Sequence, residues 1–345
     1  MQNSGISSQI YSLLNNEEFR PTTNLVISKC DAYDYLDNVR PNLEKLTTNY
    51  YDTFSITNKF TGYFSDITVG QFFNTLSMNS CDSTAILGGL DKTARKEEKS
   101  VSPSSSTSSE SKSGSSESSS SGESSEESSS QSSSSQSGEQ NMAGVITNPE
   151  DLTAGSSSVE GKRGSENIGI AVFNDDKLCG ELTAIETICH LLINNDIDSC
   201  IVSIDNPYKE NKDNSEEKIE LSLTPSKKSK IFAKIEDGIP HISIKINLRA
   251  SILTLENDIN YEQNEVLEKF STATEEYLKK EFNNYFNKVS KEYGTDIDCF
   301  CNKALAHFTT TKEWEDFNWP EKFKTAKFDI DVNIDTISSM LLTKT

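Results

Sequence analysis

A serine-rich segment divides the chain into two parts, so any compact structure must be built from two separate stretches of sequence. Between Val101 and Gln140, 24 of 40 residues are serine, and the charged residues are six glutamates against one lysine. Such a stretch has too little apolar surface to offset the entropy lost on ordering. Pro149, Gly155 and the serines at 156–158 continue the bias. The sequence therefore predicts a disordered linker over residues 93–166.

The net charge of −21 over 345 residues restricts the classes of partner. Nucleic-acid binding needs a concentrated basic face, so a nucleic-acid partner is excluded, and adhesion to anionic lipid is disfavoured. The cysteines are odd in number and scattered through apolar patterns, which predicts buried free thiols rather than a disulfide scaffold. The seven cysteines are Cys30, Cys81, Cys179, Cys189, Cys200, Cys299 and Cys301.

Residues 1–92 read as a partial α/β domain. Apolar residues from Ile10 to Leu14 predict a short helix, and residues 23–28 predict a buried strand. Asp31 is a candidate N-cap for a helix through Leu36, and Thr68 for a helix that carries Phe72, Phe73 and Leu76. These elements are too few for an independent core.

Residues 167–345 open with a hairpin and a capped helix. Ile168, Ile170 and Val172 alternate as in a half-buried strand, and residues 174–176 supply a turn before a second short strand. Thr183 and Glu186 have the spacing of a capping box, which predicts a helix through Leu192.

Four further strands are predicted at 200–204, 219–223, 231–235 and 241–249, and a last one at 328–334. Between them, an apolar stripe with helical spacing predicts a long helix from about 260 to 293, which Gly294 ends. The fold class expected for this part is α+β, a mixed and mainly antiparallel sheet packed by the long amphipathic helix. Lys227, Lys228 and Lys230 are interpreted as a solvated turn.

Candidate catalytic and metal-binding residues have simpler structural explanations. Cys299, Cys301 and His307 offer metal ligands, but thiols one residue apart point opposite ways on a strand, and no second pair completes a zinc site. Glu186 and His190 lie four residues apart on one helix, where a capping glutamate and a partly exposed histidine explain them. No catalytic residue, cofactor site or metal site is predicted.

Trp314, Phe317 and Trp319 form an aromatic cluster near the C-terminus. Aromatic side chains concentrate at protein interfaces, so these three are a possible interaction surface. The alternative, which the sequence leaves equally open, is that they anchor a loop to the core.

A series of pieces from Ile168 onward occurs in one characteristic order: Gly169-Ile-Ala-Val-Phe, Asp176-Lys-Leu-Cys-Gly, Leu182–Glu186, the helix ending near Tyr293, Thr295-Asp-Ile, Trp314, Phe317-Asn-Trp and the strand Phe328–Ile334. With these pieces, this part of the chain resembles the C-terminal domain of the Ger(x)C family, the C subunits of spore germinant receptors. Residues 1–92 resemble the family's preceding domain through Arg20–Leu36, a strand followed by an Ala-x-x-x-Leu helix.

The resemblance implies a non-enzymatic accessory subunit that contacts integral-membrane receptor subunits at the outer face of the spore inner membrane. It also implies a membrane anchor, because family members begin with a secretion signal and a lipid-modified cysteine. The first thirty positions contain neither, and no segment has the length of a transmembrane helix. A fragment, a start assigned downstream or a degenerate paralogue would each explain the difference.

Two other functions compete with this one. A hydrolase would use His190 or His307 with a nearby carboxylate or thiol. Its test is whether His190, His241 or His307 lies in a pocket with a carboxylate or thiol within hydrogen-bond reach. A secreted or surface stalk protein would use the serine-rich segment as a spacer.

Overall fold

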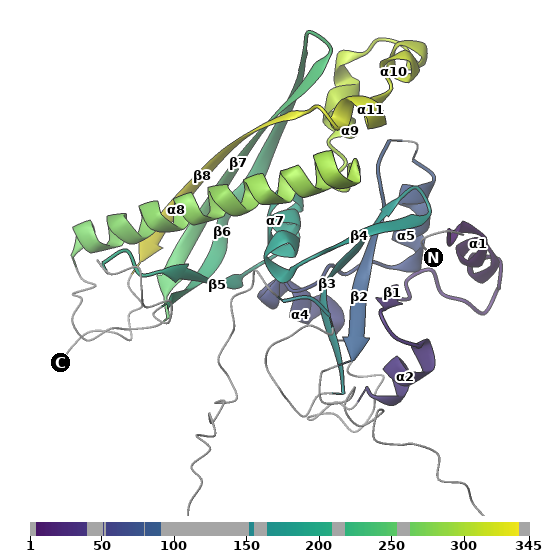
Figure 1. Cartoon of the computed structure of the whole chain (residues 1–345), viewed down its shortest axis with the longest axis horizontal. Helices are drawn as coiled ribbons and strands as arrows, with labels where there is room; N and C mark the ends of the chain where they lie inside the picture. Colours follow the sequence, from purple (N-terminus) through teal and green to yellow (C-terminus); the bar gives the residue numbers. More distant parts are fainter. Residues whose placement is uncertain are drawn as a thin grey trace, which may run out of the picture.

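The protein is built on two four-stranded sheets with a helix between them (Figure 1). The structure is a computed structural model that describes residues 5–39, 51, 53–78, 80–90, 152–154, 164–208, 218–253 and 263–337. Helix α7 (Ala184–Asn194) contacts strands of both sheets. The predicted α+β class, with its mainly antiparallel pairing and long helix, is confirmed.

The first sheet contains strands from both sides of the serine-rich segment. Its order is β1 (Val26–Ser28), β2 (Thr84–Leu90), β3 (Ser165–Asn174) and β4 (Lys177–Leu182). Strand β1 is parallel to β2, and the other two pairings are antiparallel. The strand pairing therefore crosses the boundary at residue 167 that the sequence suggested.

Gly169 shows why this sheet needs a glycine in β3. Its φ is 84°, and an added Cβ would collide with the carbonyl oxygen of Leu182 on β4. Its amide donates to the Tyr63 carbonyl oxygen at 2.6 Å. A side chain at this position would meet both a strained backbone and a rigid neighbour.

The four described helices of the N-terminal part are α1 (Ser7–Leu14), α2 (Ala32–Asp37), α4 (Phe54–Thr61) and α5 (Val69–Leu76). Three of them, α1, α2 and α5, follow the predicted signals, whereas α4 was not predicted. Asp31 caps α2, and Thr68 with Gln71 forms a capping box on α5. Phe72 packs edge-to-face on Phe173 of β3, so α5 covers the first sheet.

The second sheet has the order β5 (Cys200–Asp205), β6 (Lys218–Glu236), β7 (Ile239–Ile252) and β8 (Lys327–Ile337). The first three strands are antiparallel, whereas β8 is parallel to β7. A parallel neighbour requires a crossover connection, and the helical segment between β7 and β8 supplies it.

The long helix lies across this sheet (Figure 1). It runs as α8 (Asn264–Phe286), continues as the π-helix η2 (Asn287–Tyr293), and ends at Gly294 with φ 67°. Phe270, Phe282 and Phe286 are buried on its inner face. The elements that lead on to β8 are α9 (Cys301–Ala304), the 3₁₀ turn η3 (Leu305–His307), α10 (Thr311–Phe317) and α11 (Trp319–Phe323).

The end of the predicted linker is part of the fold. The Ala154 amide donates to Ile168 O at 3.0 Å, and the Ala184 amide donates to Leu152 O at 2.8 Å, while 165 and 166 belong to β3. Leu152 and Ala154, two apolar residues of an otherwise polar tract, are buried against the fold. The rest of the predicted linker, 93–151 and 155–163, lies outside the described residues.

The predicted turn at Lys227, Lys228 and Lys230 is wrong. These residues are exposed, as expected, but they lie within β6, which runs unbroken through both strands predicted at 219–223 and 231–235. The register with β7 shifts on either side of Lys227. Bulges of this kind admit Pro225 and an extra residue without ending the strand.

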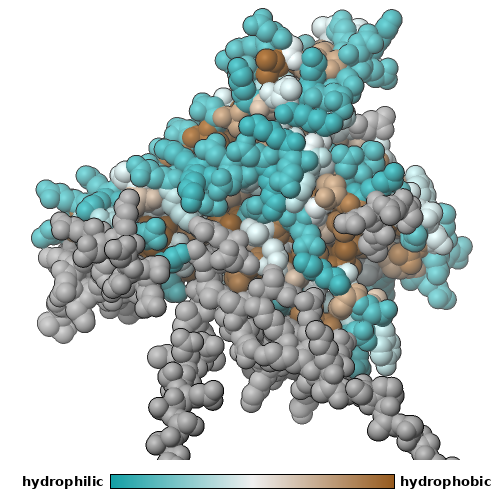
Figure 2. Space-filling model, in the orientation of Figure 1, coloured by the Kyte–Doolittle hydropathy of each residue, from teal (hydrophilic) through white to brown (hydrophobic). Residues whose placement is uncertain are grey.

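The outer surface of α8 is hydrophilic (Figure 2), in agreement with a helix that buries one face on the sheet. Within the ranges given above, no helix combines the length and the apolar character needed to cross a bilayer.

Candidate functional site

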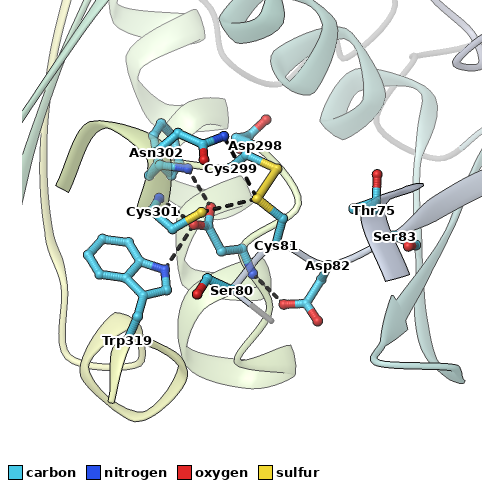
Figure 3. The surroundings of a disulfide bond; sticks show 12 residues. Thr75, Ser80, Cys81, Asp82, Ser83, Asp298, Cys299, Cys301, Asn302 and Trp319 are labelled. Atoms are coloured by element: carbon cyan, nitrogen blue, oxygen red, sulfur yellow. Dashed lines mark hydrogen bonds between the residues drawn. A yellow bond between two sulfur atoms is a disulfide. The ribbon is translucent and has the colours of Figure 1, made fainter. Parts of the chain in front are cut away.

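The loop after η2 joins the C-terminal part to the residues that precede β2. The Asp82 amide donates to Asp296 O at 3.1 Å, and the Asp296 amide donates to Asp82 Oδ2 at 2.8 Å. Beside them, Cys81 and Cys299 form a disulfide (Figure 3). We call residues 80–82 with 295–302 the junction, because they tie the two parts of the chain together.

Asp296 organises the junction from a buried position. It is 2% exposed, and its carboxylate accepts hydrogen bonds from the Phe300 amide at 2.9 Å and the Cys301 amide at 2.8 Å. Trp319 Nε1 donates to the same group at 2.9 Å. Burial raises the pKa of Asp296 to about 7, against the opposite effect of these N–H donors. The three bonds fix the start of α9 and the position of Trp319.

The cysteines at the junction correct the prediction that all seven are free thiols. Cys81 and Cys299 are paired, and Cys301 Sγ lies 3.0 Å from Cys81 Sγ. Cys299 has φ 52° and lies in a loop rather than on a strand. Because Cys299 and Cys301 both place their sulfurs against Cys81, the expectation that they point opposite ways also fails. Burial, reinforced by Asp296, raises the pKa of Cys301, which keeps this third sulfur a thiol.

His190 is buried, not partly exposed as predicted. It is 6% exposed, and its Nδ1 lies 2.7 Å from Asp298 Oδ1. The Tyr285 hydroxyl donates to Asp298 Oδ2 at 2.7 Å, and Asn194 Nδ2 donates to Oδ1 at 2.9 Å. Burial, together with the charge of Asp298, raises the pKa of the Tyr285 phenol. Asp298 thus links α7, α8 and the junction.

His190 and Asp298 together have the geometry of two of the three residues of a hydrolytic triad. An imidazole whose Nδ1 faces a buried carboxylate can serve as a general base through Nε2. Every hydrogen bond of His190 within the described residues involves Nδ1 or its backbone, so no hydroxyl or thiol there is bonded to Nε2. His307 bonds Ala233 O at 2.7 Å, and His241 lies 3.9 Å from Glu236 on the surface.

Glu186 does not pair with His190. Its carboxylate accepts from the Thr183 amide at 2.8 Å in the predicted capping box and forms an ion pair with Lys288 at 2.7 Å. Glu186 therefore caps α7 and ties it to η2. The three candidate metal ligands Cys299, Cys301 and His307 do not come together. His307 Nε2 bonds the Ala233 carbonyl oxygen, and no group of three or more possible metal ligands forms in the part of the chain that the structure describes.

The predicted aromatic surface divides into a core residue and two half-buried ones. Trp319 is 1% exposed and bonded to Asp296, so it anchors the loop to the core and offers no contact surface. Trp314 and Phe317 are half-buried. Their ring centroids lie within 6.4 Å of each other and of the ring centroid of Trp319. Trp314 also donates to Ser80 Oγ at 3.3 Å, across to the N-terminal part.

Asp296 entered the sequence analysis only as part of the resemblance, and Asp298 was missed. The available signal was the pair of aspartates two and four residues after Gly294, the glycine that ends the long helix, just before Cys299 and Cys301. Polar residues at that point bond loop amides or buried side chains, as both do here.

Two family models match the chain. One described as "Spore germination B3/ GerAC like, C-terminal" matches residues 168–340, and one described as "Spore germination protein N-terminal domain" matches residues 1–92. None of the curated proteins matches the chain. Among solved structures, the "Crystal Structure of the GerBC protein" matches with a TM-score of 0.58 and 13% identity, over 98% of this chain and 76% of that chain.

At 13% identity, the structural match shows a shared fold, and it extends across both sheets because nearly the whole chain is covered. The family assignment comes from the two models, which occur in order and cover most of the sequence. The chain therefore belongs to the GerAC-like family of spore germination proteins, the C subunits of germinant receptors.

Proposed function

We propose that this protein is a non-enzymatic accessory subunit of a spore germinant receptor, and that it acts by contacting membrane-embedded receptor subunits. The observation that carries the proposal is the match of both family models, in order, over residues 1–92 and 168–340. By the same argument, its place is at the outer face of the spore inner membrane.

The contacts of the candidate catalytic and metal-binding residues support a role without catalysis. Asp296 and Glu186 bond backbone amides, and Cys81 and Cys299 are paired with each other. The polar groups that the sequence offers for chemistry are thus used to hold elements together. Elements that are held together by such bonds suit a subunit that presents a fixed surface to its partners.

The contact surface that we propose is the exposed edge of Trp314 and Phe317. Both side chains are half-buried and pack on the ring of the buried Trp319, so they are held in place before any partner binds. Preorganised aromatic side chains lose little entropy on binding and are frequent hot spots of interfaces.

Deletion of the gene in its spore-forming host tests the function. We expect slower or absent germination with at least one germinant in a strain that lacks redundant receptors, and recovery when the gene is restored. Unchanged germination with every germinant tried would contradict the proposal.

A photo-crosslinking amino acid at Phe317 tests the contact surface, with the same residue at Tyr33 as a matched control. Tyr33 is 73% exposed and lies on α2, far from the aromatic cluster in the chain. We expect crosslinks to a membrane-embedded subunit from Phe317 and none from Tyr33. Equal crosslinking from both positions would show that the aromatic edge is not the contact.

A hydrolase remains the second candidate because of the His190–Asp298 pair. If the pair is catalytic, the full chain hydrolyses ester or amide substrates, and His190→Gln abolishes the activity. We expect no hydrolysis by either protein, since no hydroxyl or thiol among the described residues bonds Nε2 of His190, the nitrogen that would act as the base.

A further inference from the structure

A cavity of about 820 Å³ lies at the outer edge of the first sheet. Strand β1 is the outermost strand of that sheet, and α1 and α2 lie near it (Figure 1). The wall is formed by residues of α1, β1 and α2, together with residues of the segments 19–25 and 66–69. Cavities that bind small molecules in proteins measure about 300–1,000 Å³. This cavity therefore has the size of a site for a small organic ligand.

The wall of the cavity leaves apolar side chains in water on two helices. Leu13 of α1 is 42% exposed and Leu36 of α2 is 60% exposed, and both belong to the wall. Val26 and Val69 add further apolar surface, and they are less exposed. Large apolar side chains left exposed around a cavity are typical of binding sites, because a ligand covers them. The occupant should therefore have an apolar body.

One polar atom of the wall has no partner. Asp66 Oδ1 is buried and accepts no hydrogen bond from any described residue. Buried polar atoms in proteins are nearly always hydrogen-bonded, and the oxygen of a carboxylate can only accept. The missing partner is therefore a donor. Donors that carry a positive charge form the strongest hydrogen bonds to carboxylates.

The other residues of the wall also favour a cation at Asp66. Asp66 is the one acid among the described residues of the wall, and Arg20 is the one base. Arg20 is exposed, so water and salt screen its charge, whereas Asp66 Oδ1 is buried. Tyr35 and Tyr51 belong to the same wall, and the faces of aromatic rings attract cations.

We propose that this cavity binds an amphipathic amine, a small molecule with an apolar or aromatic body and a primary ammonium group. The ammonium donates a hydrogen bond to Asp66 Oδ1, and the body covers Leu13 and Leu36. The site goes beyond the receptor function and does not depend on it, because the argument uses only the residues of the wall.

Calorimetric titration of the purified full-length chain at neutral pH tests the site with three probes of similar size. Phenethylamine carries an ammonium group, 2-phenylethanol carries a hydroxyl in its place, and phenylacetate carries a carboxylate. We expect saturable binding of phenethylamine, about tenfold weaker binding of 2-phenylethanol, and no binding of phenylacetate. Equal binding of the amine and the alcohol, tighter binding of phenylacetate, or no binding of any probe overturns the proposal.

Two variants locate the binding. Asp66→Asn keeps the size of the side chain and removes its charge, and Leu36→Ser removes apolar surface at an exposed position, where the fold should tolerate the change. We expect Asp66→Asn to bind the amine no more tightly than the alcohol. Leu36→Ser should weaken both probes by the same factor, because it changes only the contact with the apolar body.

Asp37→Asn is the matched control, since Asp37 is exposed on α2 but does not belong to the wall. It should bind all three probes as the wild-type protein does. The melting temperature of each variant shows whether it is folded. Undiminished binding of phenethylamine by folded Asp66→Asn overturns the proposal. If Asp66→Asn does not fold, undiminished binding of phenethylamine by Leu36→Ser overturns it.

Discussion

Replacing Asp296 by asparagine should change how the stability of the protein depends on pH. The substitution keeps the size of the side chain and removes its ability to ionise. In the wild-type protein this carboxyl group is buried at the junction, where it accepts three N–H donors and has a pKa raised to about 7 by burial. The variant loses at least one of these bonds, because its amide nitrogen faces an N–H group.

The direction of the effect follows from proton linkage. Between the ordinary pKa of 3.8 and about 7, the unfolded chain releases the proton of Asp296 while the folded protein retains it. The folded state then binds more protons, so the stability contributed by this group is fully present below 3.8 and is lost as pH rises through 7. At about 1.4 kcal/mol per pH unit, the whole change is about 4 kcal/mol, of which about 3 kcal/mol falls between about pH 5 and about pH 8.

Urea unfolding of both proteins, followed by tryptophan fluorescence across this range, measures the difference. We expect the advantage of wild type over Asp296→Asn to shrink by about 3 kcal/mol as pH rises. Asp335→Asn, at an exposed position on β8, is the control and should differ from wild type by a constant amount. An advantage that grows with pH would show that the N–H donors outweigh burial and that the folded protein holds Asp296 as a carboxylate.

Three other predictions concern the disulfide, the first sheet and the serine-rich segment. In Cys299→Ser, Cys81 should pair with Cys301, whose sulfur lies 3.0 Å away, when the protein is oxidised with glutathione disulfide; peptide mapping by mass spectrometry detects the new bridge. Gly169→Ala should lower the free energy of unfolding by about 2–4 kcal/mol in urea titrations, through its strained φ and its clash with a backbone oxygen. Excision of residues 101–140 should change that free energy by only about 1 kcal/mol, because closure entropy varies with the logarithm of loop length.

Each of these has its own control. Cys81→Ser should leave Cys299 and Cys301 unbridged, and a bridge that formed there would contradict the proposed geometry. Gly238→Ala has a similar φ of 75° but open space around its Cβ, so it should cost only about 1 kcal/mol. An excision variant that fails to unfold cooperatively would show that 101–140 contribute to the fold.

The sequence predicted the local structure well because the signals for it are local. Thr68 and Thr183 each cap a helix with a partner three residues away, so both capping boxes could be identified from spacing alone. The alternation of β7 and the stripe of α8 likewise report which face is buried. The three lysines at 227, 228 and 230 were interpreted as a turn because a bulge within a strand and a turn favour similar residues, such as the proline at 225.

The site was harder to predict because its contacts join distant positions. Cys81 and Cys299 are separated by 218 positions, and no spacing rule connects two cysteines so far apart. His190 was predicted to be partly exposed on its helix. Its burial depends on Asp298 and Tyr285, which come from other elements. Side chains that meet only through tertiary packing leave no periodic pattern in the sequence.

The pairing of β2 with β3 explains how one fold accommodates the serine-rich segment. Leu90, the last residue of β2, lies opposite Ser165, the first residue of β3, so the chain leaves and re-enters the sheet at the same place. The ends of the segment are thus held together by the strand ladder, whatever its length. Because each doubling of a loop costs only about 0.6 kcal/mol, an insertion at this position does not compete with the core. The two family models end and begin at residues 92 and 168, so the serine-rich segment falls between them, while the pairing of β2 with β3 joins the residues on either side of it.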